Sequence, residues 1–184
     1  MSRQYFEDLI IDPPVANIVA TTSTVETGLW NVAQYSPIHA FDGYKGTGKV
    51  YRLCAGGIFS TSSVAPTLIL TARLGTSSTS ASLGTSVTQT LPASLTNEPW
   101  FLHSIWVVRA LGAPGLNSTV AGTEIWNGGG VAGTAASNAT IGIGGVPNTA
   151  CDLSIETGIF LGASWSTTLT NSITVQWITM QSLN

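Results

Sequence analysis

Apolar and polar residues alternate along residues 49–75, and this pattern predicts two strands around a polar turn. A period of two is typical of a strand that has one solvated face. The turn, 60–66, allows either a β-hairpin or two strands that leave a corner of an all-β domain. One face of the first strand would carry Tyr51, Leu53, Ala55 and Phe59, and one face of the second would carry Leu68, Leu70, Ala72 and Leu74.

The pair Gly56-Gly57 interrupts the first of these strands. Glycine inside a strand weakens it, because glycine has no side chain to pack and loses the most backbone entropy. It is found where a bulge forms or where another part of the chain approaches closely. We therefore expect a bulge or a close contact at this pair.

Short segments of strand character continue to the end of the chain, and no helical pattern interrupts them. The run WFLHSIWVVRA predicts a central strand, 76–82 a surface loop, and 91–99 an ordered polar loop between prolines. This spacing predicts an all-β fold, a jelly-roll-like β-sandwich in one domain, 16–184. The strands are expected within 15–31, 51–59, 67–74, 86–90, 100–110, 117–126, 139–143, 150–155, 159–165 and 172–180.

The first 15 residues differ from the rest and predict a short extended N-terminal arm. They combine Glu7, Asp8 and Asp12 with apolar residues and end in Pro13-Pro14, which stops a helix or central strand. The alternative is a frayed terminus or an edge strand of the same domain. If the arm docks on a partner, the docking residues would be Tyr5, Phe6, Leu9, Ile10 and Ile11.

The composition has few charges. Asp, Glu, Lys and Arg supply 8% of the residues, whereas an ordinary domain has about 25%. Such a surface gives a free monomer little electrostatic protection against association, so we favour a component of an assembly over a secreted β protein. The net charge of −3 with scattered cations argues against nucleic acid as a partner.

Localisation signals are also missing from the sequence. The start, MSRQYFEDLIIDPP, lacks the basic and apolar regions of a signal peptide, and no run of apolar residues is long enough to span a membrane. We therefore expect a protein that is made in the cytoplasm and is not exported through a signal peptide. Cys54 and Cys151 do not define a disulfide framework, and two buried thiols are expected.

One near-match to a phosphate-binding loop is rejected. Residues 43–49, GYKGTGK, fit the first seven positions of G-x-x-x-x-G-K-[S/T], but Val50 replaces the hydroxyl residue that holds magnesium. The loop should also open a helix, and β-branched and aromatic residues follow instead. No nucleotide or other cofactor is expected.

The residues that carry catalysis or bind metals are scattered. His39 and Asp42 are close in sequence, but His103 lies alone in a predicted strand, and a metal needs three or four converging ligands. The serine motif G-x-S-x-G is absent. We therefore predict a protein that is not an enzyme, although a hydrolase would use carboxylates from among Asp42, Glu98, Glu124, Asp152 and Glu156.

Six tryptophans offer an interaction surface. Trp106, Trp165 and Trp177 lie in apolar strand settings and are predicted to be in the core. The other three lie at strand ends or loops, where either an interface or a sugar-stacking role suits them. These candidate interface aromatics are Trp30, Trp100 and Trp126.

Two segments resemble virion structural proteins of tailed bacteriophages. In the first, Arg73-Leu74-Gly75 ends a strand, a Ser/Thr/Gly loop follows, and the connection LPASLTNEPW leads to a strand ending near Arg109. The second is GASWSTTLTNSITVQWITMQSLN, similar to the closing strands of these proteins. The resemblance implies a jelly-roll-like β-sandwich, a homotrimer and assembly on the particle, and it supplies no catalytic residues.

The expected function is therefore that of a capsid decoration (cement) protein that binds the outside of a phage head, with the major capsid protein or other virion proteins as partners. The alternative is a tail or head-fibre module that binds carbohydrate on the host surface. Exposed tryptophans beside polar side chains would favour this alternative, whereas a hydrolase requires a cleft with converging carboxylates.

Overall fold

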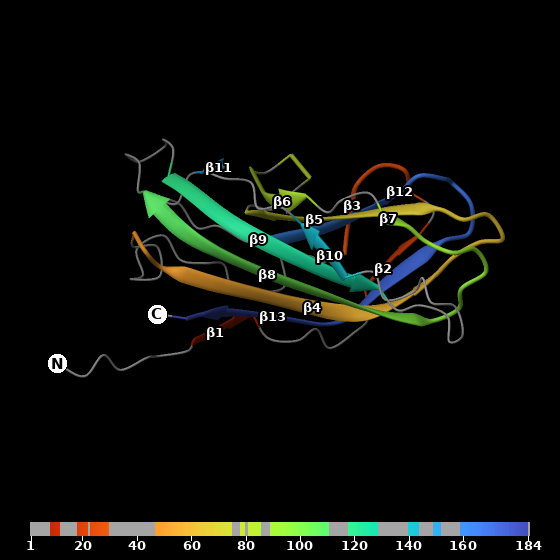
Figure 1. The fold of residues 1–184 in the computed structure, drawn as a ribbon, viewed down its shortest axis with the longest axis horizontal. Helices are drawn as coiled ribbons and strands as arrows, with labels where there is room; N and C mark the ends of the chain where they lie inside the picture. Colours follow the sequence, from red (N-terminus) through yellow and green to blue (C-terminus); the bar gives the residue numbers. More distant parts are fainter. Residues whose placement is uncertain are drawn as a thin grey trace.

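The computed structural model describes residues 8–11, 18–21, 23–29, 47–74, 78–79, 81–85, 89–110, 118–128, 140–143, 149–151 and 159–183. Every regular element in these ranges is a β-strand, so the prediction of an all-β fold is confirmed (Figure 1). The strands are β1 (Asp8–Ile11), β2 (Ile18–Thr21), β3 (Thr27–Gly28), β4 (Val50–Ser60), β5 (Thr67–Leu74), β6 (Ala81–Thr85), β7 (Gln89–Thr90), β8 (Glu98–Ala110), β9 (Ser118–Gly128), β10 (Thr140–Ile143), β11 (Thr149–Cys151), β12 (Ile159–Trp165) and β13 (Ser172–Ser182).

The strands form two antiparallel sheets. The larger sheet has the order β1-β13-β4-β8-β9-β10, with β2 also on β13 and β11 also on β9. The smaller sheet has the order β3-β12-β5-β6, with β7 also on β5. The predicted central strand is β8, which lies between β4 and β9.

The two strands predicted around the polar turn belong to different sheets. β4 ends at Ser60 in the larger sheet, and β5 begins at Thr67 in the smaller one. Of the two predicted arrangements, the hairpin is wrong and the corner is confirmed. β4 and β5 nevertheless share one core, because their apolar faces enter it from the two different sheets.

One apolar cluster takes side chains from both sheets. In the larger sheet, alternate residues of β4 and β8 are buried, from Tyr51 to Phe59 and from Trp100 to Val108. In the smaller sheet, Leu68, Leu70 and Ala72 of β5 are buried with the inward residues of β12. Tyr51 and Trp106 stack inside this cluster with ring centroids 4.2 Å apart.

Both edges of the larger sheet are built from short strands. β1 and β2 pair with opposite ends of β13, and β10 and β11 pair with opposite ends of β9. A long open edge would offer a template for pairing with another chain, and short edge strands reduce this risk. The faces and loops, more than the edges, are therefore the parts of this sheet suited to contact partners.

Strand boundaries in one region differ from the prediction. β6 begins at Ala81, inside the predicted surface loop 76–82, and pairs with β5 through Arg73 and Leu74. Small residues favour turns when read alone. Here the long strand β5 offers a ladder partner, and tertiary pairing determines the structure.

An ion pair between Glu26 and Arg73 connects residues 23–29 to β5 of the smaller sheet. Arg73 donates from Nε to Glu26 Oε1 (2.8 Å) and from Nη2 to Glu26 Oε2 (2.6 Å). The hydrogen bond to Glu26 raises the pKa of the Arg73 guanidinium, burial opposes this, and the Glu26 charge adds to it. Gly162 of β12 leaves the room that the Glu26 side chain occupies, because a Cβ there would collide with that side chain.

Candidate interaction surfaces

The predicted docking arm is described only in part. Leu9, Ile10 and Ile11 belong to β1, whose backbone pairs with β13 through Met180, Gln181 and Ser182. The interpretation of this segment as an edge strand is therefore correct for residues 8–11. Tyr5 and Phe6 lie outside the described residues, so a docking role of the arm stays a prediction.

Among the predicted interface aromatics, Trp100 is corrected. Its side chain is only 4% exposed and belongs to the apolar core, so the prediction that it lies on the surface is wrong. The reason is that β8 starts at Glu98, which places Trp100 inside the strand and in phase with Leu102. Trp126 lies on β9, where its backbone pairs with Leu102, and Trp30 lies outside the described residues.

Trp177 is also corrected, in the opposite direction. It was predicted to be in the core, but its side chain is 36% exposed. A β-bulge in β13 explains the difference. Val175 pairs with Gly57 and Trp177 pairs with Gly56, so Gln176 is an extra residue that reverses the alternation of the strand.

The Gly56-Gly57 pair makes room for this bulge, as the sequence predicts. A Cβ on Gly57 would collide with the carbonyl of Thr174 and would stand 3.0 Å from Gln176 N. That carbonyl accepts a hydrogen bond from Trp100 Nε1 at 3.1 Å. The close contact expected at the glycine pair is therefore present.

The neighbouring glycine, Gly56, supports Trp177. A Cβ on Gly56 would lie 2.7 Å from Cε2, Cζ2 and Nε1 of the Trp177 indole, so the indole lies across this glycine. The two glycines thus accommodate different groups, the bulge carbonyl at Gly57 and the indole of Trp177 at Gly56. Adjacent strand residues point to opposite faces of a sheet, so the Trp177 indole lies on the face away from the core.

We call the exposed group Phe101, Ile105 and Trp177 the aromatic patch. Phe101 and Ile105 are the outward residues of β8 and are 39% and 40% exposed. The rings of Phe101 and Trp177 have centroids 5.8 Å apart and an interplanar angle of 35°. The patch is therefore a short apolar surface on the outer face of β13, β4 and β8.

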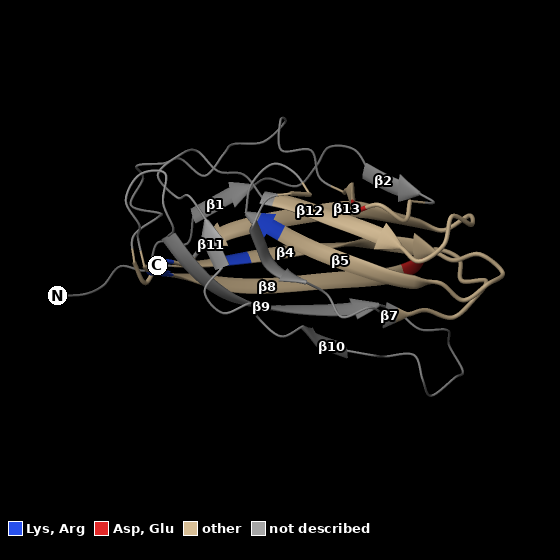
Figure 2. Ribbon diagram, turned by 90° about the horizontal axis from the view of Figure 1, so that it is seen from above, with Lys and Arg blue, Asp and Glu red and all other residues tan. Residues whose placement is uncertain are grey.

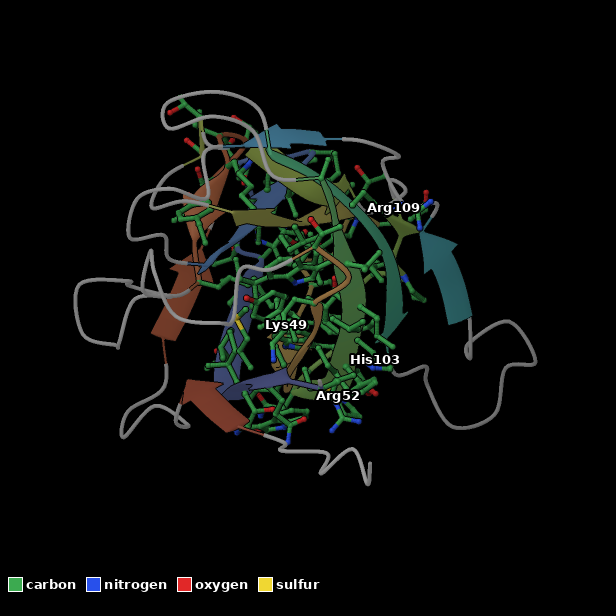
Figure 3. The ribbon with its side chains drawn as sticks, turned by 90° about the vertical axis from the view of Figure 1, so that its left-hand side faces the viewer. Lys49, Arg52, His103 and Arg109 are labelled. Atoms are coloured by element: carbon green, nitrogen blue, oxygen red, sulfur yellow. The ribbon has the colours of Figure 1, made fainter. Side chains whose placement is uncertain are left out.

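Polar side chains border the aromatic patch. His103 lies between Phe101 and Ile105 on β8, and its ring centroid is 6.2 Å from that of Phe101. Arg52 donates from both Nε (2.8 Å) and Nη2 to Gln181 Oε1. Figure 3 shows His103 and Arg52 projecting from the side of the larger sheet that faces away from the core.

Cys54 is the cross-strand neighbour of His103. It is a free thiol and is half-buried, not fully buried as predicted; the side chain of Cys151 is not described. Burial raises the pKa of the Cys54 thiol, and the charge of Arg52 opposes this only in part. Because the thiolate is the nucleophile, a raised pKa does not suit Cys54 to nucleophilic catalysis.

A second surface lies at one end of the molecule, where three loops meet. We call residues 61–66, 91–97 and 166–171 the loop end; Figure 1 shows it at the opposite end of the molecule from the C-terminus. The buried Thr61 joins two of the loops. Its hydroxyl donates to Pro92 O (2.7 Å) and accepts from Leu95 N (2.9 Å), while its backbone N donates to Leu95 O (3.0 Å).

The third loop is held by Asn171, which is 1% exposed. Its Oδ1 accepts from Ser62 N at 2.9 Å, and its Nδ2 donates to Thr167 Oγ1 at 3.1 Å. Ser166 Oγ accepts from Thr67 N at 2.8 Å. Together with the bonds of Thr61, these side-chain hydrogen bonds connect the three loops to one another.

The loop end presents hydroxyl and apolar groups without charge. Its three segments contain no Asp, Glu, Lys, Arg or His, and Val64 and Leu169 are 53% and 43% exposed. Figure 2 shows the described Lys and Arg residues toward the opposite end. Ser94 and Asn97 have φ angles of 59° and 54°, a conformation that non-glycine residues adopt at a cost and that is concentrated at functional sites.

Sequence reasoning identified the loop end only in part. The segment 91–99 was predicted to be an ordered polar loop, and the hydrogen bonds of Thr61 and Leu95 confirm its order. The meeting of this loop with 166–171 was not predicted. The available signal was Asn171, a polar residue directly before a strand, but only the fold shows which loop it binds.

The residues considered for catalysis do not form a described site. Within the described ranges, no group of three His, Cys, Asp or Glu side chains is placed to hold a metal ion. Glu98 begins β8 and Glu124 lies on β9. His39, Asp42, Asp152 and Glu156 lie outside the described residues.

Comparisons with known proteins add no relatives. No protein-family model, no curated protein and no solved structure matches the chain. Across the part of the chain that the structure describes, no helix has the length and apolar character needed to span a membrane. The functional inference therefore depends on the two surfaces and on the resemblance of the sequence.

Proposed function

We propose that this protein is a non-enzymatic decoration protein of a bacteriophage head, which binds the outside of the capsid shell and stabilises it. In this proposal the two sheets form a jelly-roll-like β-sandwich, and the protein acts on the virion as a homotrimer. Its partners are the major capsid protein and other copies of itself. The loop end contacts the shell.

The observation that carries this proposal is that two of the three loops of the loop end come from the segments that resemble phage virion proteins. Residues 91–97 belong to the first segment that resembles phage virion proteins, and residues 166–171 belong to the second. Both loops bind the remaining loop, 61–66. Thr61 donates to Pro92 O in the first, and Ser62 N donates to Asn171 Oδ1 in the second. Loops from the two resembling segments, separated in the sequence by residues 98–165, thus come together in one surface, as expected if that surface is what such proteins share.

The chemistry of the loop end suits attachment to a protein shell. Surface loops held on a β scaffold carry binding functions, and an ordered loop loses little conformational entropy on binding. The absence of charge avoids the desolvation cost of burying ions in an interface. In this proposal the protein binds the assembled shell and not its separate subunits. Binding would therefore stabilise the assembled shell by mass action.

Substituting the two exposed apolar residues of the loop end tests the proposal. We expect the double variant Val64→Asp/Leu169→Asp to fold normally and to lose cosedimentation with undecorated heads, because a carboxylate buried without a partner costs several kcal/mol. Ala110→Asp is the matched control, since Ala110 is exposed at the far end of β8 and should tolerate the same change. Equal binding by the double variant and the control would refute contact through the loop end.

The arm is tested separately, because β1 lies toward the C-terminal end of the molecule, far from the loop end (Figure 1). We propose that Tyr5 and Phe6 dock on a neighbouring protomer. Deletion of residues 1–7 leaves β1 paired with β13 and is expected to reduce the trimer to monomers in size-exclusion chromatography with light scattering. Deletion of residues 1–14 also removes β1. This variant should still fold, because β13 keeps β4 as its partner, and it should be a monomer like the shorter deletion. An unchanged trimer in the shorter deletion would contradict the role of the arm.

A further inference from the structure

We propose that the aromatic patch is a binding platform for neutral saccharides, with the Trp177 indole as the surface on which a pyranose ring stacks. This site goes beyond attachment to the shell. It lies on the outer face of the larger sheet, on β8 and β13, and shares no residue with the loop end.

The Trp177 indole lies against the β4 backbone with one face and leaves the other face open to a ligand. Three of its atoms lie 2.7 Å from the position that a Cβ of Gly56 would take, so one face of the indole is turned to the β4 backbone. The opposite face points away from the sheet, and the side chain is 36% exposed. An aromatic face carries partial negative charge, which attracts the polarised C–H groups on the apolar side of a pyranose.

The Phe101 ring provides a second apolar surface beside the indole. Its ring is tilted by 35° from the indole with centroids 5.8 Å apart. The two rings are tilted relative to each other, so together they form a bent apolar surface and not a flat one. Such a surface fits a sugar ring on the indole with a linked unit resting against Phe101, so an oligosaccharide should bind more tightly than a monosaccharide.

Hydrogen-bonding groups lie beside the rings, as saccharide hydroxyls require. Gln176 is the exposed extra residue of the bulge, and Thr179 is half-exposed two residues after Trp177. Arg52, the nearest described cation on this face, is already bonded to Gln181. No carboxylate belongs to the described side chains of this face, and a neutral ligand is therefore favoured over a charged one.

The size of the patch argues against a protein partner here. A large aromatic side chain buries about 150–250 Å², so three side chains that are about two-fifths exposed offer on the order of 250 Å². A stable protein interface needs about 800 Å² from each partner. A ligand that covers one or two rings and finds polar groups beside them matches this surface better.

The test uses the full-length protein with cellohexaose, maltohexaose and chitohexaose, and follows tryptophan fluorescence and indole N–H shifts in NMR spectra. At least one of these neutral oligosaccharides is expected to bind, and Trp177→Ala should weaken it at least about tenfold. Gly56→Ala should weaken it similarly although it leaves the tryptophan in the chain, because the new Cβ displaces the indole. Leu169→Ala, at the loop end, is the control and should bind like the wild type.

Three outcomes would overturn the proposal. The first is that none of the three oligosaccharides binds at millimolar concentration. The second is binding that Trp177→Ala leaves unchanged. The third is a change of oligomeric mass in Trp177→Ala, which would make the patch a contact between copies. Because Val64→Asp/Leu169→Asp tests shell attachment through other residues, failure of either proposal is recognised separately.

Discussion

Replacing Gly57 with alanine is expected to destabilise the protein by about 3 kcal/mol or more, a large loss for one methyl group. The added Cβ would collide with the carbonyl of Thr174, which is backbone and is held in place by the bulge of β13. Moving that carbonyl would also disturb its hydrogen bond from Trp100 Nε1. Urea denaturation followed by circular dichroism would measure the loss.

Gly56→Ala is the matched control for this prediction. It adds the same methyl group to the same strand, but the three atoms nearest to the new Cβ belong to the Trp177 side chain and not to the backbone. This side chain is exposed and can rotate away, so the expected loss is below about 1 kcal/mol. If both variants were equally stable, the close approach at Gly57 would not constrain β4 and β13.

The glycine pair shows how far sequence reasoning reaches in this protein. Alternation in β4 and β5 predicts these strands and their buried faces, because the period of a strand is fixed by its geometry. β8 was predicted from its long apolar run alone, and the burial of Trp100 on its inner face was missed. An interrupted alternation predicts a close contact at Gly56-Gly57. It cannot identify the contacting strand, β13, which follows more than 110 residues later in the chain.

The wrong placement of Trp177 has a definite physical origin. Ile173 and Val175 set a phase that would bury Trp177, whereas Ile178 and Met180, which are also buried, follow the opposite phase. A strand can bury both pairs only if one residue is inserted between them. The break in phase is therefore present in the sequence between Val175 and Ile178, and the register of β13 and β4 places the extra residue at Gln176.

The surfaces are harder to predict than the strands. The residues of the loop end come from three separate segments, and their hydrogen bonds through Thr61 and Asn171 depend on how the strands are ordered. The aromatic patch joins β8 to β13 across β4, which sequence proximity does not indicate. Composition alone pointed to a surface covered by partners, and it could not locate that surface.

Trp100→Ala is expected to destabilise the protein by about 3–5 kcal/mol, because it leaves a large cavity in the core. The indole is 4% exposed, lies directly across from Gly57 in the register of β8 and β4, and reaches Thr174 O on β13. It therefore connects three neighbouring strands. Domains are stable by only about 5–15 kcal/mol, so a loss of this size is a large share of the total stability. The milder variant Trp100→Phe is therefore measured beside it.

Trp100→Phe keeps an aromatic ring in the core and removes the indole N–H that donates to Thr174 O. The expected loss is about 1–2 kcal/mol from the missing hydrogen bond and the smaller ring, measured by urea denaturation. Cosedimentation with heads should be unchanged wherever the variant is folded, because a buried side chain cannot contact a partner. The opposite result, normal stability with lost binding, would return Trp100 to the surface role that its place near a loop first indicated and would contradict its burial in the core.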